Sequence, residues 1–183
     1  MQNRRRTTAE RFLLLASRLG PSELVAGEVR TMSPAGYRHG LVSQRLGGLL
    51  DAYVRRHRLG FVPDAETGFV LRRHPDTVRA PDVAFVSKAR HERVGATEAF
   101  FPGPPDLAAE VRSPDDRPGE IRAKVRSWLT AGCRLVWVID PKRRSATVYR
   151  QGRPPQEIAP SGTLTGGTVV RGFRVPLANL FDF

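Results

Sequence analysis

The sequence predicts an α/β fold in which helices flank a mixed central sheet. Two segments, 37–58 and 117–131, carry apolar side chains at the spacing of amphipathic helices. Short apolar runs, separated by loops rich in Pro and Gly, lie between and after these segments and indicate strands. A strand at 106–111, the helix at 117–131 and a strand at 134–139 predict a right-handed crossover between two parallel strands.

The first predicted elements are a short helix and a hairpin. Thr7 and Glu10 stand at capping-box spacing, and the apolar residues that follow run up to Gly20, which ends the helix. The stretch "ELVAGEVRTM" then predicts a β-hairpin that turns at Ala26 and Gly27. A Ser-Pro pair breaks the chain after this hairpin.

A long core helix and three strands follow. Apolar residues recur at helical spacing from Tyr37 to Arg58, and Gly60 ends this helix. Because the loop at 88–105 contains "FFPGPP", we expect it to hold no regular structure. The three strands are expected at 61–71, with Gly68 as a bulge, at 82–87 and at 106–111.

The C-terminal part of the chain predicts a second helix, a hairpin and an apolar tail. Asp115 or Asp116 caps the helix at 117–131, and Pro118 fits its first turn. The runs "LVWVID" and "SATVYR", joined by the turn "PKRR", predict the hairpin, and "GFRVPLANLFDF" supplies apolar residues that pack at the C-terminus. We therefore expect one domain over 1–183, with an N-terminal helix in 1–20 and a core over 23–183.

Length and composition bound the class of protein. A chain of 183 residues with 40% hydrophobic content is long enough for one domain with a buried core and too short for two. No apolar run approaches the roughly 20 residues of a membrane-spanning helix, and the apolar stretch near the N-terminus is too short for a signal peptide. The single Cys133 allows no internal disulfide. We therefore expect a soluble, cytoplasmic protein with no membrane partner.

The chain is strongly basic, with a formal net charge of +12 and 30 cationic side chains, of which Lys88, Lys124 and Lys142 are the only Lys. Clusters of Arg create a positive field that attracts nucleic acid, and we favour this partner over a merely solvated basic surface. A bias in coding composition is the other explanation of the Arg excess. The candidate phosphate contacts in these clusters are Arg55, Arg56, Arg72 and Arg73.

Two carboxylates stand at the ends of predicted strands. Asp82 opens the strand in "APDVAF", and Glu110 lies near the end of the strand in "DLAAEVR". If these strands pair antiparallel, the start of one meets the end of the other, and the two acids share one edge of the sheet. Such a pair suits a hard cation such as magnesium or manganese. The alternative is a turn residue at Asp82 and an ion pair between Glu110 and a surface Arg, and spacing alone leaves both open.

Several motifs, in a fixed order, resemble one known family. The chain carries "RAPDVAFV", then "PDLAAEVRSPDD", then a Lys in the following helix and "VWVIDP" before the hairpin turn. Over nearly the whole chain this order resembles the Uma-two family of restriction-endonuclease-like proteins, a branch of the PD-(D/E)XK nuclease superfamily. The resemblance implies a restriction-endonuclease-like core of helix, three strands, helix and strand, in agreement with the element order above.

The resemblance also implies roles for single residues. Asp82 and Glu110, with the backbone carbonyl of Val111, resemble the metal-binding groups. Arg112 occupies the lysine position of the superfamily's E-x-K pattern, whereas the Uma-two relatives place a lysine in the next helix, where Lys124 lies. The group beside the attacking water must lose or relay a proton, and a guanidinium stays protonated. Lys124 is therefore a better candidate for this role than Arg112. The alternative is a structural lysine at the border of the core. Arg112 is then a phosphate contact or a surface residue.

Three further residues are weaker candidates. Glu28 matches a family Glu after the hairpin Gly and is either a third acid or part of a hairpin ion pair. His39 lies one turn before Val42 and faces inward, where a satisfied structural histidine is favoured over a metal ligand. Glu66, in "DAETGF", faces either the site or solvent, and the sequence does not decide between them.

The resemblance implies a magnesium-dependent endonuclease that hydrolyses phosphodiester bonds, in DNA rather than RNA, with manganese as the other plausible metal. Cutting both strands of a duplex favours a symmetric homodimer. The rival expectation is a non-catalytic nucleic-acid-binding or assembly module on the same fold. The joint presence of Asp82, Glu110 and Lys124 favours the enzyme, because a decayed site is expected to have lost at least one of them.

Overall fold

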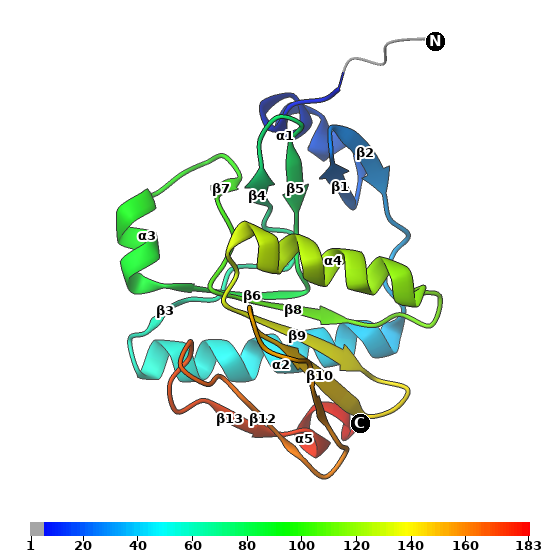
Figure 1. The fold of residues 1–183 in the computed structure, drawn as a ribbon, viewed down its shortest axis with the longest axis vertical. Helices are drawn as coiled ribbons and strands as arrows, with labels where there is room; N and C mark the ends of the chain where they lie inside the picture. Colours follow the sequence, from blue (N-terminus) through cyan, green and yellow to red (C-terminus); the bar gives the residue numbers. More distant parts are fainter. Residues whose placement is uncertain (1–5) are drawn as a thin grey trace.

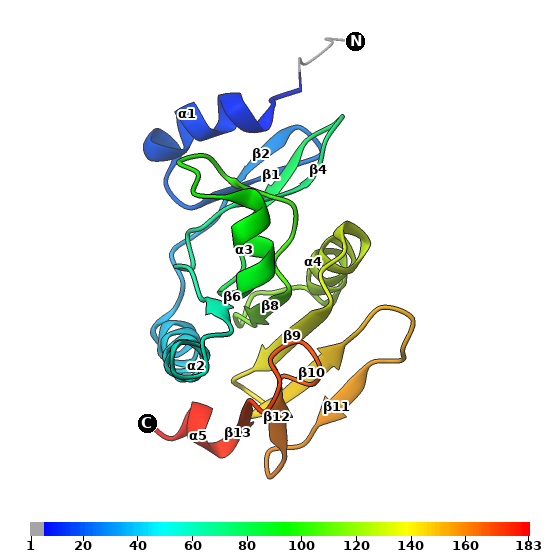
Figure 2. The same ribbon diagram turned by 90° about the vertical axis from the view of Figure 1, so that its left-hand side faces the viewer.

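The centre of the molecule is a six-stranded mixed sheet, seen in Figures 1 and 2. The computed structural model describes residues 6–183. In spatial order the strands are β11 (Gln156–Ile158), β10 (Ser145–Tyr149), β9 (Leu135–Asp140), β8 (Leu107–Val111), β6 (Val83–Ser87) and β3 (Gly60–Phe61). Strands β8 and β9 run parallel and are joined by helix α4 (Pro118–Ala131), while the other neighbouring strands pair antiparallel. The predicted mixed sheet and its connecting helix are confirmed.

Helices cover both faces of this sheet because side chains alternate along its strands. Helix α2 (Tyr37–Arg56) packs onto one face and α4 onto the other, so that Figure 2 shows the sheet between them. The face beneath α2 is built from alternate strand residues, which are Val83, Phe85, Leu107, Ala109, Val111, Leu135, Trp137 and Ile139. The intervening residues, which are Ala84, Val86, Ala108, Val136 and Val138, face α4. Each fully buried large apolar side chain contributes roughly 1.5–3 kcal/mol, so this two-sided core holds the sheet in place.

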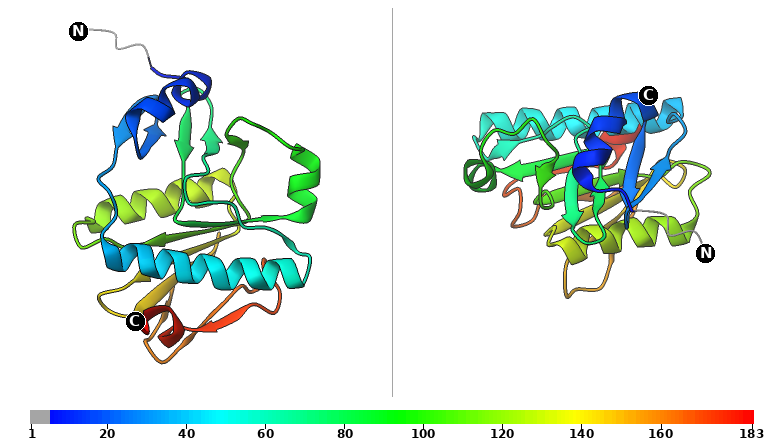
Figure 3. Two further views of the ribbon diagram at one scale, coloured as in Figure 1. Left: turned by 180° about the vertical axis from the view of Figure 1, so that it is seen from behind. Right: turned by 90° about the horizontal axis from the view of Figure 1, so that it is seen from above.

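A second sheet of five strands carries the N-terminal elements and lies above the first in Figure 1. In spatial order its strands are β2 (Glu28–Thr31), β1 (Ser22–Val25), β5 (Thr77–Arg79), β4 (Phe69–Arg72) and β7 (Phe101–Pro102). Helix α1 (Ala9–Leu19) packs Ala9 and Phe12 against Leu24, Val70 and Val78 of this sheet. Figure 3, seen from above, shows α1 lying across these strands.

The C-terminal segment completes the core beside α2. Strands β12 (Thr163–Thr165) and β13 (Arg174–Pro176) form a two-stranded ribbon, and the short helix α5 (Ala178–Phe181) follows. Phe173, Val175, Leu177, Leu180 and Phe181 belong to the same buried cluster as the apolar face of α2. The predicted packing of the apolar tail is therefore confirmed.

The N-terminal turn signals act nearly as predicted. Thr8, one residue later than expected, caps α1 by accepting the Arg11 N–H, and the helix ends at Gly20. Ala26 and Gly27 take positive φ angles of 53° and 82° and form the turn between β1 and β2. Residues 1–5 of the expected N-terminal segment lie outside the residues that the structure describes.

The start of α4 differs from the expected Asp cap. The carboxylate of Asp116 accepts the Ser113 N–H at 2.7 Å, so it organises the turn before the helix. The helix begins at Pro118, and the carboxylate of Glu120 accepts the Arg117 N–H at 3.3 Å. The first-turn Pro was therefore a better guide to the helix start than the acids before it.

The expected strand over 61–71 is wrong, because this segment crosses from one sheet to the other. Residues 60–61 form the edge strand β3 of the six-stranded sheet, and 69–72 form β4 of the five-stranded sheet. Between them the Asp64 carboxylate accepts the Glu66 N–H at 2.7 Å and makes a turn. Gly68 is no bulge, because the register shift falls between Val70 and Arg72. A Cβ at position 68 would lie 2.4 Å from the Phe100 ring, so close packing explains the glycine there.

The expectation of an irregular loop at 88–105 is also wrong. Helix α3 (Lys88–Val94) is capped by Ser87, whose hydroxyl accepts the Arg90 N–H, and it ends at Gly95. Strand β7 pairs parallel to β4 at the edge of the five-stranded sheet, and an edge strand tolerates Pro102. Over residues 6–183, none of the helices is long and apolar enough to cross a membrane.

Candidate active site

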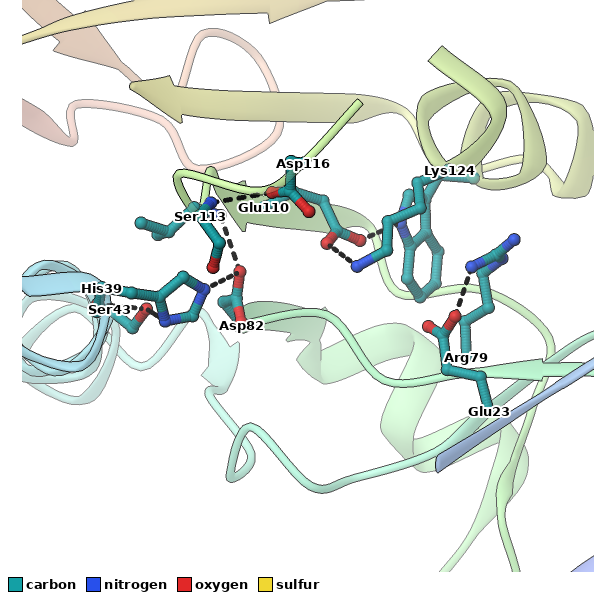
Figure 4. Close-up of polar contacts among 11 residues, drawn as sticks. Glu23, His39, Ser43, Arg79, Asp82, Glu110, Ser113, Asp116 and Lys124 are labelled. Carbon is teal, nitrogen blue, oxygen red and sulfur yellow. Dashed lines mark hydrogen bonds and ion pairs between the residues drawn. The ribbon is translucent and has the colours of Figure 1, made fainter. Parts of the chain in front are cut away.

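Asp82 and Glu110 lie at the neighbouring strands β6 and β8, and in Figure 4 the Asp82 carboxylate points toward His39 while the Glu110 carboxylate points toward Lys124. The antiparallel register pairs Val83 with Ala109, so Asp82, one residue before β6, lies opposite Glu110. Asp82 Oδ2 accepts the Val111 N–H at 2.6 Å. The antiparallel pairing on which the sequence argument depended is present, and it places both carboxylates at one edge of the sheet.

Glu110 is almost completely buried, and helix α4 supplies two hydrogen-bond donors to it. Its side chain is 2% exposed. Lys124 Nζ donates to Glu110 Oε2 at 2.9 Å, and Trp128 Nε1 donates to Oε1 at 2.7 Å. Lys124 and Trp128 are one helical turn apart, so both reach Glu110 from the same face of α4. The lysine at the border of the apolar stripe thus reaches inward.

Burial and neighbouring charges set the electrostatics of this pair. Burial raises the pKa of Glu110 to about 7. The Lys124 ammonium lowers this pKa, and the Asp82 carboxylate raises it. Burial lowers the pKa of Lys124, but the carboxylates of Glu110 and Glu23 outweigh this effect and leave that pKa above its ordinary value. Lys124 is therefore held as a cation among acidic side chains.

His39, in the first turn of α2, contacts the other acid of the site. Its Nε2 atom lies 3.3 Å from Asp82 Oδ2, and Ser43 Oγ lies 3.4 Å from its Nδ1 atom. The hydrogen bond with Asp82 raises the pKa of His39, while burial opposes this rise. His39 is therefore a hydrogen-bonded, inward-facing histidine that holds Asp82 from the helix side (Figure 4).

A buried ion pair that the sequence analysis missed lies near these residues. Glu23 of β1 and Arg79 of β5 form it with side chains that are 5% and 6% exposed (Figure 4). The Glu23 charge helps to raise the pKa values of Glu110 and Lys124. Because 56 residues separate Glu23 from Arg79, no local pattern reveals the pair. The signal that was available is a charged residue inside the short apolar strand "SELV".

The two other predicted acids lie at exposed positions. Glu28 is the first residue of β2, next to the hairpin turn. Glu66 lies in the turn between β3 and β4. Among residues 6–183, neither of them completes a group of three or more His, Cys, Asp or Glu side chains around a metal position.

The donor set of Asp82 and Glu110 fits a hard divalent cation. Magnesium is usually held by one or two protein carboxylates, with water and substrate phosphate oxygens as its other ligands. Two carboxylates at one edge of a sheet match that mode without a third acid. Both oxygens of the Glu110 carboxylate accept hydrogen bonds from Lys124 and Trp128. A cation bound by Glu110 would therefore have to share these oxygens with the two donors or displace the donors.

The four arginines that the sequence suggested as phosphate contacts lie in two places away from the acids. Arg55 and Arg56 end α2, about 25 Å along the helix from His39. Arg72 ends β4 and Arg73 follows it, where two carboxylates already bind the Arg73 guanidinium. The structure does not bring these four residues together.

Arg112 lines a cavity of about 610 Å³. Other residues that line it are Arg38, His39, Ser113, Lys142 and Arg143. Arg112 Nη1 donates to Asp140 Oδ2 at 2.8 Å, and Asp140 Oδ1 accepts the N–H groups of Lys142 and Arg143 at 3.0 Å each. Asp140 therefore organises the β9–β10 turn, and His39 connects this cavity to Asp82.

Comparisons with known proteins agree with the fold and with the motifs. A solved structure described as a putative nuclease belonging to DUF820, from Anabaena variabilis, is similar with a TM-score of 0.80 and 19% sequence identity, covering 96% of this chain and 97% of that chain. At this identity the likeness shows the fold alone. No curated protein matches the chain.

The family comparison covers far more than half of the chain. The model of the Uma2 (Uma-two) family, described as "Putative restriction endonuclease", matches residues 9–178. The matched range contains both acids, the lysine and all strands of the six-stranded sheet. The resemblance carried by the ordered motifs is thereby confirmed, and the protein belongs to the Uma2 family of putative restriction endonucleases.

Proposed function

We propose that the protein is a metal-dependent endonuclease that cleaves phosphodiester bonds in DNA. The observation that carries this proposal is the convergence of Asp82, Glu110 and Lys124 at one edge of the central sheet. The family and the fold support a nuclease, and the strongly basic chain supports a nucleic acid as its substrate.

The two acids have the chemistry to hold the metal. Asp82 and Glu110, with the carbonyl of Val111, would bind magnesium, and manganese is the alternative. A divalent cation at this position would supply a Lewis acid to the scissile phosphate. The protein contributes a fixed position for Asp82, because the Val111 N–H and His39 both contact its Oδ2 atom.

Lys124 has the properties of an electrostatic catalyst. Its ammonium is anchored at 2.9 Å on Glu110 and keeps its proton at neutral pH, since its pKa is raised above the ordinary value. A fixed cation of this kind stabilises the negative charge that builds up on the phosphate as the bond is attacked. Lys124 would therefore orient water and stabilise charge, and a different group would accept the proton of the attacking water.

Cleavage of supercoiled plasmid and of single-stranded DNA, with and without magnesium or manganese, tests the proposal. We expect cleavage that requires the metal and that falls roughly 100-fold or more in Asp82→Asn, Glu110→Gln and Lys124→Met. Glu66→Gln, which makes the same chemical change at an exposed acid, serves as the matched control and should cleave like the unaltered protein. Unchanged metal-dependent cleavage in Asp82→Asn or Glu110→Gln would overturn this mechanism.

A non-catalytic binding module is the second candidate function. One observation favours it, namely that both oxygens of the buried Glu110 carboxylate already accept N–H donors from α4. Calorimetric titration with manganese and calcium separates the two functions. Metal binding that disappears in Asp82→Asn supports the enzyme, whereas no binding up to about millimolar metal supports the module.

A further inference from the structure

The cavity beside Asp82 collects side chains from three separate segments of the chain. Arg38 and His39 come from the first turn of α2, Arg112 and Ser113 from the turn after β8, and Lys142 from the β9–β10 turn. The cavity has a volume of about 610 Å³. Because His39 also lies 3.3 Å from Asp82 Oδ2, the cavity adjoins the proposed catalytic centre.

The charged side chains that line this cavity are mostly cationic. Its cations are Arg38, Arg112, Lys142 and Arg143, and its acid is Asp140. The Asp140 carboxylate is already used inside the protein, since it accepts N–H groups from the β9–β10 turn and from the Arg112 side chain. Arg38, Lys142 and Arg143 are exposed, so their charges are available to a ligand.

The start of α2 adds to the positive potential of the cavity. This helix of 20 residues has Gly36 at its N-cap, with no side-chain hydrogen bond to its first turn, and it has no acidic residue in that turn. The free N–H groups and the helix dipole at such an end favour an anion. Here this end coincides with the cationic lining, because Arg38 and His39 belong to the same turn.

We propose that this cavity binds the backbone phosphates of the nucleic-acid strand next to the scissile phosphate. The proposal rests on the proposed function, since Asp82 and Glu110 define where the scissile phosphate lies. A phosphodiester is the anion that matches a cationic cavity at the side of such a centre, because Arg and Lys side chains bind the backbone phosphates of nucleic acids. Arg38, Lys142 and Arg143 are then substrate-positioning residues, together with Arg112.

The position of this site differs from that of the arginine clusters in the sequence. Arg55 and Arg56 lie about 25 Å along α2 from His39. They are exposed and contribute to the overall field, but a phosphate next to the scissile one does not reach them. Because of this distance, a charge reversal in the cavity can be compared with a charge reversal at Arg55 and Arg56, which lie far from it.

The test measures binding of labelled DNA in EDTA, so that cleavage does not interfere. The cavity variant is Lys142→Glu/Arg143→Glu, and the control is Arg55→Glu/Arg56→Glu, which changes the net charge by the same amount. We expect the cavity variant to weaken binding at least about tenfold and to reduce the slope of log affinity against log salt by about 2, because two phosphate contacts are lost. The control should change affinity less than about threefold. Duplex DNA, single-stranded DNA and RNA of the same sequence identify which backbone the cavity prefers.

Three outcomes would overturn the inference: equal losses in the two variants, no loss in the cavity variant, or no binding of any nucleic acid by the unaltered chain at low salt. Folding is checked by melting temperature, and Lys142→Gln/Arg143→Gln replaces the reversal if that variant is unstable. Failure of the proposed function is recognised separately. A chain that binds DNA through the cavity but never cleaves it refutes the nuclease and leaves the phosphate site standing.

Discussion

At the scale of single residues, two tryptophans on opposite faces of the central sheet differ in one hydrogen bond. Trp128 and Trp137 are both fully buried. The Trp128 indole N–H donates to Glu110 Oε1 at 2.7 Å, whereas the Trp137 N–H has no partner among the residues that the structure describes. An unmade bond to a buried carboxylate is costly, while loss of an unpaired buried donor removes a cost.

We therefore expect Trp128→Phe to lower the free energy of unfolding by about 1–3 kcal/mol more than Trp137→Phe does. Both variants lose the same indole ring atoms, so the difference reports the Trp128 hydrogen bond to Glu110 together with the unpaired donor of Trp137. Denaturant unfolding followed by circular dichroism measures it. Equal destabilisation by the two variants would show that this hydrogen bond contributes nothing to stability.

The residues of the candidate site differ in how far the sequence reveals them. Asp82 and Glu110 can be found because each stands at a strand end, and antiparallel pairing of neighbouring strands then brings them together. Lys124 is indicated by the order of family motifs, and its helical position allows it to face inward. Glu23 and Arg79 could not be found, because a contact between distant residues depends on the pairing of β1 with β5, which no local spacing encodes.

At the scale of elements, the Glu23–Arg79 ion pair lies between β1 and β5 of the five-stranded sheet. Both side chains are buried, and Glu23 Oε1 and Arg79 Nε have no hydrogen-bond partner within residues 6–183. Breaking a buried pair leaves an uncompensated charge, whereas replacing both partners by apolar residues removes two desolvation costs. Removing one partner is therefore expected to lower the stability strongly, whereas replacing both partners by apolar residues is expected to change it little.

We expect Glu23→Ala to lower the free energy of unfolding by about 3–5 kcal/mol, and Glu23→Met/Arg79→Met to recover most of this loss. The exposed pair of Arg55 and Asp51 is the control, and Arg55→Met should cost less than about 1 kcal/mol. Urea unfolding of the four proteins measures these differences. A double variant as unstable as Glu23→Ala would contradict the argument.

Asp76 connects helix α1 to the turn between β4 and β5. Its Oδ2 atom accepts the Ala9 N–H at 2.8 Å and a bond from the Arg73 guanidinium at 2.8 Å, and its Oδ1 atom accepts the His74 N–H at 3.1 Å. Burial raises the pKa of Asp76, but these three donors outweigh it and hold the pKa below the ordinary value. The carboxylate therefore stabilises the fold when it is ionised.

The pH dependence of this contribution has a definite sign. Because the pKa of Asp76 is lower in the folded chain than in the unfolded chain, the stabilisation is complete above the unfolded value and is lost as pH falls through the folded one. We expect Asp76→Asn to cost about 2 kcal/mol near pH 7. The difference from the unaltered protein should persist to about pH 5 and shrink below about pH 4. Unfolding curves at these pH values measure it, and a difference independent of pH would refute the assignment.

Elements with strong local signals were predicted well, and elements defined by their partners were not. Helices α2 and α4 and strands β6, β8 and β9 follow from apolar spacing within one segment. The split between β3 and β4 does not, because both strands are apolar and only their different sheets separate them. Strand β7 forms because β4 offers it a free edge, which overrides the Pro and Gly content of its segment.

At the scale of the whole molecule, the net charge follows from the composition, whereas the fold determines which parts of the surface carry that charge. Several arginines are neutralised by nearby acids, as Arg73 is by Glu10 and Asp76. Others line the cavity beside Asp82, where four cations gather from three segments far apart in the chain. A net charge of +12 therefore predicts general attraction to nucleic acid, and the strongest contacts are expected at the cavity.

The salt dependence of DNA binding separates this organised charge from a basic surface that reflects only coding bias. Three exposed cavity cations, Arg38, Lys142 and Arg143, that each neutralise one phosphate predict a slope of about −3 for log affinity against log salt. Between about 50 and 200 mM salt, the affinity should therefore fall roughly 50-fold. Fluorescence anisotropy with a labelled duplex in EDTA measures this slope. A slope near zero, or no binding even at the lowest salt, would mean that the positive charge of this chain has no nucleic-acid partner, and the endonuclease proposal would then lose its substrate.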